Sequence, residues 1–207
     1  MSRKKISFRD LKTTADVAVW VARLNSEWPE RREIVDHIVQ QVGQWPGPDL
    51  LVIELCSGHG QLARALLQAW PQLRYTGFDS SALLLQSAGA DLAEFGSRVS
   101  LIEANLNQAA WLDQVPQPVQ AIVSMQSLHD LGGEAEVDRI YGLAKQLLAP
   151  GGLFLNADLV VPPGKPLPHN PGRRSIARHL ELLQSHGYRQ VSCSLAAGDF
   201  GCCLGYK

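Results

Sequence analysis

This sequence has almost no net charge, few cysteines and no long apolar stretch. Its 19 Lys and Arg nearly balance 20 Asp and Glu, and the formal net charge of −1 argues against a general nucleic-acid binder. The four cysteines form no CxxC pair, so neither a disulfide framework nor a zinc site is expected. No uncharged apolar run approaches the roughly 20 residues of a membrane span, and the basic N-terminus lacks an apolar segment. We therefore expect a reduced, soluble, cytoplasmic protein without a metal site or a membrane span.

The charges that are present are unevenly distributed. Between residues 46 and 160, twelve acids stand against five bases. Four bases then follow without an acid between them, namely Lys165, Arg173, Arg174 and Arg178. Such charges are typical of a solvated surface. The more specific interpretation is an acidic cofactor region with a basic rim that receives an anionic substrate.

Apolar runs and turn residues alternate regularly along the 207 residues, of which 45% are hydrophobic. The pattern predicts helices at 14–26 and 30–42, then strands at 50–53, 73–78, 99–102, 119–124 and 153–157 and helices at 60–69, 81–94, 134–148 and 175–186. Strands that alternate with helices predict a parallel sheet with helices on both faces. The strands predicted at 190–195 and 200–206 are too close for a crossover, so they must form an antiparallel hairpin.

These elements together predict an α/β fold in one globular unit. We expect a Rossmann-like three-layer sandwich around a mostly parallel seven-stranded sheet with an antiparallel last strand. Residues 1–49 are expected to form an N-terminal helical cap, and residues 50–207 the cofactor-binding domain.

A Gly-rich turn follows the first predicted strand, where ligands of open α/β sheets bind. Gly58 and Gly60 let the backbone turn sharply and approach a ligand closely. The segment fits the dinucleotide pattern GxGxxA, and Asp79 lies where a ribose-binding acid belongs. However, Glu54 at the strand end would repel a pyrophosphate, whereas it suits a ligand with an ammonium and a sulfonium. Asn105, at the end of the third strand, has the donor and acceptor that an adenine edge requires.

An ordered set of motifs carries a resemblance to a known family. The segments are LVIELCSGHG (51–60), YTGFDSS (75–81), LIEANL (101–106), AIVSMQSLHDL (121–131), LLAPGGLFL (147–155) and LLQSHGYRQV (182–191). In this order they resemble the class I S-adenosylmethionine-dependent methyltransferases, whose reversed last strand agrees with the predicted hairpin. The resemblance implies S-adenosyl-L-methionine as cofactor, S-adenosyl-L-homocysteine as product, and methyl transfer to an O, N, S or C atom.

The resemblance also implies the residues of the cofactor site. They are Glu54, Cys56, Gly58, Gly60, Asp79, Ser80, Asn105, Leu106 and Met125. Two of them depart from the family pattern, because Cys56 replaces the first motif glycine and Asn105 stands where Asp is common. Cys56 is expected to narrow the site for the methionine part of the cofactor.

One side chain, His129, is a candidate for catalysis, because it follows the fourth strand and can take a proton near neutral pH. The alternatives are a wall of the substrate site and a structural histidine. His59 is expected to be a solvent-facing spacer within the Gly-rich turn. Trp28 and Arg31 could fold the N-terminal helices over the cofactor, with helix packing and surface charge as the alternative.

The acceptor is the least determined part of the prediction. A small molecule is expected, and an anionic one would suit the four basic residues. RNA is a weaker alternative, since no aromatic residue interleaves with these bases. Two other functions stay open: a non-catalytic S-adenosylmethionine-binding or partner module, and an NAD-dependent oxidoreductase. The oligomeric state is not determined by the sequence.

Overall fold

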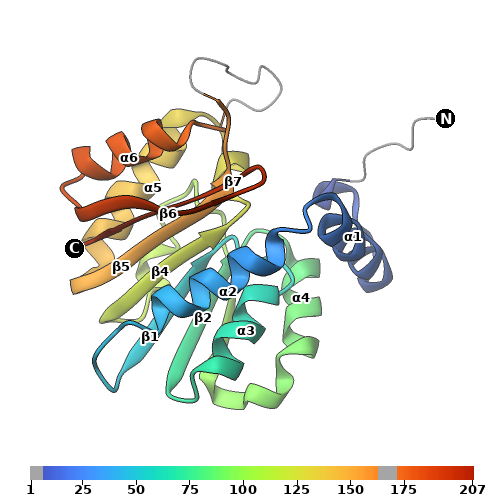
Figure 1. Cartoon of the computed structure of the whole chain (residues 1–207). Coiled ribbons are helices and arrows are strands. Elements are labelled where there is room, and N and C mark those ends of the chain that lie inside the picture. Colours follow the sequence, from blue (N-terminus) through green and yellow to red (C-terminus); the bar gives the residue numbers. More distant parts are fainter. Residues whose placement is uncertain (1–6, 163–171) are drawn as a thin grey trace.

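Seven strands form one mixed sheet in the computed structural model, which describes residues 7–162 and 172–207 (Figure 1). The strands are β1 (Leu50–Leu55), β2 (Leu73–Asp79), β3 (Val99–Glu103), β4 (Val119–Met125), β5 (Leu148–Leu159), β6 (Arg189–Ala197) and β7 (Phe200–Tyr206). Their order in the sheet is β3-β2-β1-β4-β5-β7-β6. The strands β1 to β5 are parallel, and β7 lies antiparallel between β5 and β6. The predicted fold class and terminal hairpin are therefore confirmed.

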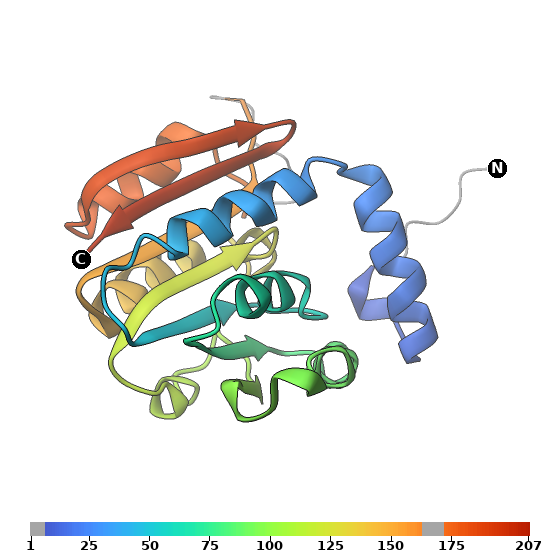
Figure 2. The same cartoon turned by 60° about the horizontal axis from the view of Figure 1, so that its bottom comes forward.

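Helices cover both faces of the sheet, as Figure 2 shows. The α-helices of the described residues are α1 (Thr14–Glu27), α2 (Arg31–Val42), α3 (Gln61–Ala69), α4 (Ala82–Asp91), α5 (Glu134–Leu147) and α6 (Ile176–Ser185). Along β1, Leu50 and Val52 pack with α2 and α3, whereas Leu51 and Ile53 pack with α5 and α6. A strand that is buried on both sides in this way requires a continuous apolar run, which is why the sequence signal was strong.

The start of β5 differs from the prediction. The sequence predicted a helix that ends at residue 148 and a strand that begins at residue 153, with residues 149–152 between them. Instead β5 begins at Leu148, which pairs with Val119, and the register shifts before Leu153 pairs with Ala121. The Pro-Gly-Gly segment is thus an irregularity inside the strand, where glycine and proline are tolerated.

The two N-terminal helices occupy different places. Ile34, Ile38 and Val42 bury one side of α2 in the core, so this helix belongs to the layer that covers the sheet. In both ribbon views α1 stands apart from the sheet (Figures 1 and 2), and among its residues only Val17 is buried. Of the two helices, α1 has the position expected of a cap, and the boundary between residues 49 and 50 stays a prediction. None of the described helices is long and apolar enough to cross a bilayer.

Candidate functional site

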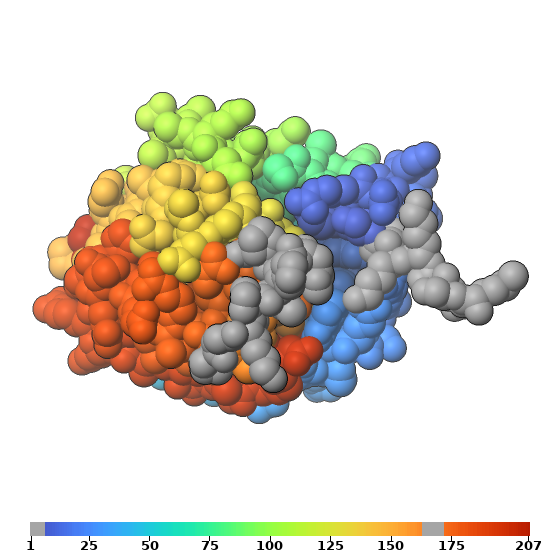
Figure 3. All heavy atoms as spheres, turned by 90° about the horizontal axis from the view of Figure 1, so that it is seen from above, coloured from blue at the N-terminus to red at the C-terminus, as the bar shows by residue number. Residues whose placement is uncertain are grey.

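A cavity of about 800 Å³ lies at the carboxyl ends of β1, β2 and β4. Residues of α1 form its opposite wall, and Figure 3 shows this helix (dark blue) lying beside α4 (teal to green). The volume is within the range of small-molecule sites. Eight of the predicted site residues line the cavity: Glu54, Cys56, Gly58, Asp79, Ser80, Asn105, Met125 and His129. Parallel strands end at one edge, so residues that are far apart in sequence meet there.

The Gly-rich turn between β1 and α3 has three residues in the left-handed region. Cys56, Gly58 and Gly60 have φ angles of 58°, 56° and 84°. A Cβ on Gly58 would meet no atom within 4 Å, whereas one on Gly60 would lie 3.1 Å from Leu92 Cδ1. Gly58 therefore leaves open space at the cavity, and Gly60 lets α3 and α4 pack closely. Cys56 adopts at some cost a backbone conformation that glycine would adopt freely.

Asp79 fixes this turn to the end of β2. One carboxylate oxygen accepts from the backbone N–H of Gly58 at 2.8 Å, and the other accepts from the N–H of Ser81 at 2.9 Å. Ser81 caps α4 with its own side chain, so Asp79 is not needed as the helix cap. Burial raises the pKa of Asp79, and the backbone N–H groups oppose that effect. The carboxylate is thus held at the cavity with lone pairs available to a ligand.

Glu54 is a buried acid at the cavity floor, with 3% of its surface exposed. The hydroxyl of Tyr75 donates to its Oε2 at 2.5 Å. Burial raises the pKa of Glu54 to about 8, Asp79 adds to the effect, and Tyr75 and Arg31 oppose it. A positively charged ligand in the cavity would favour the ionised carboxylate and lower this pKa.

Arg31 is a further cavity residue, which the sequence assigned only as a possible part of the cap. Its guanidinium donates to Asn25 Oδ1 at 3.1 Å, to Gln61 Oε1 at 2.9 Å and to Gln126 Oε1. Burial lowers its pKa to about 10, and Glu54 opposes this. The available signal was its position on the apolar face of α2, three residues before Ile34. A charge on that face is buried and needs partners.

His129 lies in a short 3-10 turn (Leu128–Asp130) after β4 and is buried against β5. Its Nδ1 is 2.5 Å from Asp158 Oδ1, and its backbone N–H donates to Asp158 Oδ2 at 3.1 Å. Burial lowers the pKa of His129, but Asp158 and Asp130 raise it by more, so the net shift is upward. Burial raises the pKa of Asp158, but His129 and the other nearby groups together lower it by more, so the net shift is downward and favours the ionised carboxylate. An ionised carboxylate can only accept, so Nδ1 of His129 donates in this bond.

The remaining predicted residues have more varied positions. Met125, Ser80 and Asn105 line the cavity, and the latter two are exposed. The Oδ1 of Asn105 accepts from the N–H of Asn107 at 2.9 Å. Gly60 and Leu106 do not line the cavity, and the Leu106 side chain is buried in the core. Contact of these two residues with a cofactor stays a prediction.

The expectation that His59 faces solvent is wrong. Its ring meets Trp20 of α1 edge-on, with 6.3 Å between ring centroids, and both residues line the cavity. Burial lowers the pKa of His59 to about 4, and Arg31 adds to this effect. His59 is therefore neutral at physiological pH and forms part of the contact between the Gly-rich turn and α1.

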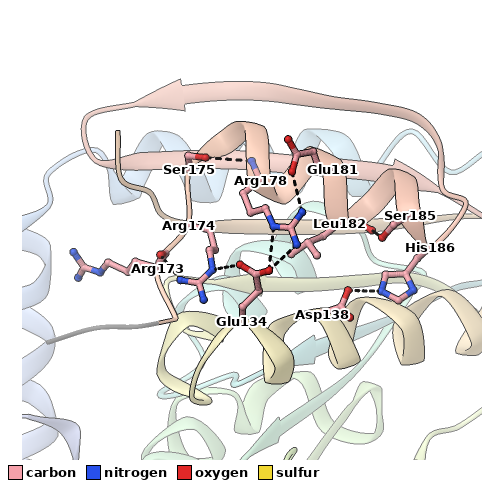
Figure 4. Close-up of polar contacts among 10 residues, drawn as sticks. All are labelled: Glu134, Asp138, Arg173, Arg174, Ser175, Arg178, Glu181, Leu182, Ser185 and His186. Atoms are coloured by element: carbon pink, nitrogen blue, oxygen red, sulfur yellow. Dashed lines mark hydrogen bonds and ion pairs between the residues drawn. The ribbon is translucent and has the colours of Figure 1, made fainter. Parts of the chain in front are cut away.

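The prediction of a basic rim is only partly right. Figure 4 shows that Glu134 of α5 lies between Arg174 and Arg178. Glu134 pairs with Arg174 at 2.7 Å and with Arg178 at 2.6 Å. Arg173 lines the cavity instead, and Lys165 lies outside the described residues. The sequence could not reveal this neutralisation, because Glu134 is about 40 residues away along the chain.

No group of three or more His, Cys, Asp or Glu side chains that could hold a metal occurs within 7–162 and 172–207. All four cysteines are free. Burial raises the pKa of the Cys56 thiol well above its usual value, with Asp79 adding to the effect. This thiol is therefore a protonated wall of the cavity rather than a nucleophile.

Comparison with known proteins gives a family match over the centre of the chain. A family model described as a methyltransferase domain matches residues 52–152. A ribosomal RNA small subunit methyltransferase H of Synechococcus sp. (strain CC9605) is 33% identical over 99 residues, which are 48% of this chain and 31% of that protein. A 3-amino-4-hydroxybenzoate 4-O-methyltransferase of Streptomyces cremeus is 29% identical over 103 residues, 49% of this chain and 27% of that protein. The matches thus span about a third of these curated relatives.

Solved structures share the fold over nearly the whole chain. An O-methyltransferase family protein from Burkholderia thailandensis has a TM-score of 0.71 and 19% identity, covering 94% of this chain and 61% of that chain. Human N-acetylserotonin methyltransferase, in complex with SAM, has a TM-score of 0.68 and 17% identity, with coverage of 94% and 56%. At these identities the likeness establishes the fold.

The two glycines of the turn provide a test of the site geometry. Gly60→Ala should lower the free energy of unfolding by about 1–2 kcal/mol, because the methyl group adds crowding against Leu92 to the left-handed strain. The matched change Gly58→Ala should cost about 1 kcal/mol or less, since its methyl group meets open space. Urea unfolding of both variants measures the difference, and equal losses would contradict the assigned roles.

Proposed function

We propose that the protein is a class I S-adenosylmethionine-dependent methyltransferase that transfers a methyl group from S-adenosyl-L-methionine to a hydroxyl group of a small molecule. The methyltransferase-domain model that matches residues 52–152 supports this proposal. The observation that carries this proposal is the buried His129–Asp158 pair on the same cavity as the Gly58–Asp79 turn. One half of the cavity suits the cofactor, and the other half offers a base to the acceptor.

The residues present fit this cofactor. The open space at Gly58 allows close approach, Asp79 offers acceptor oxygens to ribose hydroxyls, and Glu54 suits an ammonium group or a sulfonium. Arg31 is the buried cation on the same cavity that can balance a carboxylate of the methionine part. When bound, S-adenosylmethionine supplies a methyl group on a positively charged sulfur atom.

The arrangement disfavours a dinucleotide. Asp79 already accepts from the N–H of Gly58, a group that a pyrophosphate would need. The carboxylate of Asp79 would repel its negative charge, and an anion would further disfavour the ionised form of the buried Glu54. The methyltransferase-domain match also covers the glycines that suggested the oxidoreductase. These features disfavour an NAD-dependent oxidoreductase.

His129 is proposed as the general base. With the Nδ1 proton held by Asp158, its Nε2 can take the proton of an acceptor hydroxyl. The positive charge that forms on the imidazole is stabilised by Asp158, which holds the ring in one orientation as well. Such a base is useful for a hydroxyl group, whose oxygen is a weak nucleophile until it loses its proton.

Two alternatives remain for the same cavity. The ribosomal RNA methyltransferase among the relatives makes RNA an alternative acceptor, but Glu134 takes up two of the arginines that would bind phosphates. The strained, non-glycine Cys56 motivates the second alternative, a non-catalytic binding or partner module. An assay with labelled S-adenosylmethionine distinguishes the three functions. Label in hydroxyaromatic compounds supports the proposed function, label in total RNA supports the RNA alternative, and label in neither supports the non-catalytic module.

The first prediction of the proposed function concerns the base. His129→Gln should lower kcat about 10²- to 10⁴-fold while the affinity for S-adenosylmethionine changes little, because only the proton transfer is lost. Asp158→Asn should also lower kcat, since an amide stabilises the imidazolium less. His186→Gln is the matched control, because this histidine pairs with Asp138 away from the cavity. A normal kcat in His129→Gln would show that no base is used at this position.

A second prediction concerns pH. The base must be neutral, and its pKa is raised in the folded protein. The kcat/KM of the wild type should therefore fall as the pH decreases through an apparent pKa above 6.5. The remaining activity of His129→Gln should lack this acidic limb. Steady-state rates with a hydroxyaromatic acceptor between pH 5.5 and roughly 9 measure both profiles.

A third prediction separates binding from stability at Glu54. Because its folded pKa of about 8 exceeds the ordinary 4.5, the ligand-free protein should lose stability as the pH rises between these values. Glu54→Gln should remove this loss, worth roughly 4 kcal/mol at pH 8. The same change should weaken S-adenosylmethionine binding, because the cation loses a carboxylate.

The two effects of Glu54→Gln have opposite signs and separate measurements. Urea unfolding at several pH values reports the stability. Calorimetry at pH 7 in buffers of different ionisation enthalpy should detect a proton released on binding to the wild type, and none from Glu54 in the variant. Unchanged affinity in the variant would remove Glu54 from the cofactor site.

A further inference from the structure

We infer that Arg173 recognises a carboxylate on the acceptor, so that the substrate class is hydroxylated aromatic carboxylic acids. This inference rests on the proposed function and names the substrate class of the same cavity. Two features of the structure locate Arg173 there, namely the close contact of Gly172 with the His129 turn and the different pairing of the neighbouring arginines.

Gly172 packs closely against the turn that carries His129. A Cβ on Gly172 would lie 1.9 Å from the backbone O of His129 and 2.8 Å from that of Gly132, so a side chain cannot be accommodated without movement. On the other side, the carbonyl of Arg174 accepts from the N–H of Val161 at 3.1 Å. Arg173 is thus held from both sides, next to the proposed base, and lines the cavity.

The three neighbouring arginines have different surroundings. Arg174 and Arg178 pair with Glu134, and Figure 4 shows the Arg173 side chain pointing away from that acid. Within the described part of the chain, Arg173 forms no ion pair, and its buried Nε has no hydrogen-bond partner. A buried donor without a partner is unfavourable. A carboxylate of the substrate would satisfy it, because the planar guanidinium binds carboxylates in a bidentate manner.

The rest of the cavity favours an aromatic ring in the part of the substrate that lies between His129 and Arg173. Trp20, Leu24 and Trp28 of the N-terminal segment line the wall opposite the strands. Flat apolar walls suit a ring, with its hydroxyl at His129 and its carboxylate at Arg173. The positive charge of Arg173 lowers the pKa of His129. A bound carboxylate would offset this effect, so an anionic substrate would strengthen the base that it needs.

The test compares acids with their uncharged amides. The probes are ortho-, meta- and para-hydroxybenzoate and para-hydroxyphenylacetate, each with its primary amide, and labelled S-adenosylmethionine as methyl donor. The wild type should prefer at least one acid over its amide. Arg173→Gln should raise the KM for that acid about 10- to 100-fold and leave the amide within about 3-fold, as expected for losing a charge-assisted bond. Arg173→Lys should recover only part of the preference.

Arg178→Gln is the matched control, because it removes the same charge from an arginine that does not line the cavity. It should keep the acid preference. Equal KM values for acid and amide in the wild type, or an unchanged preference in Arg173→Gln, would overturn the inference even if methyl transfer occurs.

A binding measurement separates this inference from the proposed function. Calorimetry with para-hydroxybenzoate and its amide, with and without S-adenosylhomocysteine, tests Arg173 without turnover. Selective binding of the acid that Arg173→Gln abolishes would support the inference even if no probe is methylated. Failure of the wild type to bind S-adenosylmethionine would overturn the proposed function alone, and acid binding that Arg173→Gln leaves unchanged would overturn the inference alone.

Discussion

The hydrogen bond from the N–H of Gly58 to Asp79 is the interaction on which the site depends. It joins the turn after β1 to the end of β2, and the second oxygen of Asp79 accepts from the N–H of Ser81 at the start of α4. A left-handed turn with open space at Gly58 persists because the carboxylate fixes its backbone. One buried acid therefore shapes the turn and presents oxygens to the cavity, which combines a structural role with a proposed binding role.

Burial disfavours the charged forms of the acids at the cavity, and a cationic ligand would stabilise those charged forms. Glu54 and Asp79 both have raised pKa values through burial, and Arg31 has a lowered one. Each group is less stable in its charged form than it would be in water, because the cavity floor excludes solvent. The hydrogen bonds of Arg31 to Gln61 and Gln126 also connect α2 to α3 and to the end of β4. A helix of the N-terminal segment is thereby coupled to the proposed cofactor site.

On the acceptor side of the cavity, buried contacts also position His129 and Arg173. Asp158 of β5 orients His129, and the absence of a side chain on Gly172 allows its backbone to pack closely against the same turn. Arg173 is then held beside the base, while Glu134 neutralises the arginines on α6 and just before it. The global charge balance therefore says little about the substrate, since Arg173 lines the cavity whereas Arg174 and Arg178 are paired with Glu134.

The sequence by itself determined the order of strands and helices, the terminal hairpin and most of the cofactor side of the cavity. These features depend on local patterns: apolar runs, a Ser cap, and polar residues directly after the strands of a parallel sheet, whose ends must meet at one edge. Only the tertiary structure decided which charges are paired and which are buried. Glu134 meets arginines about 40 residues away, Asp158 meets His129 at a separation of 29, and His59 turns inward to Trp20. The packing of α1, α5 and β5 around the cavity brings these partners together. No spacing along the chain specifies that packing.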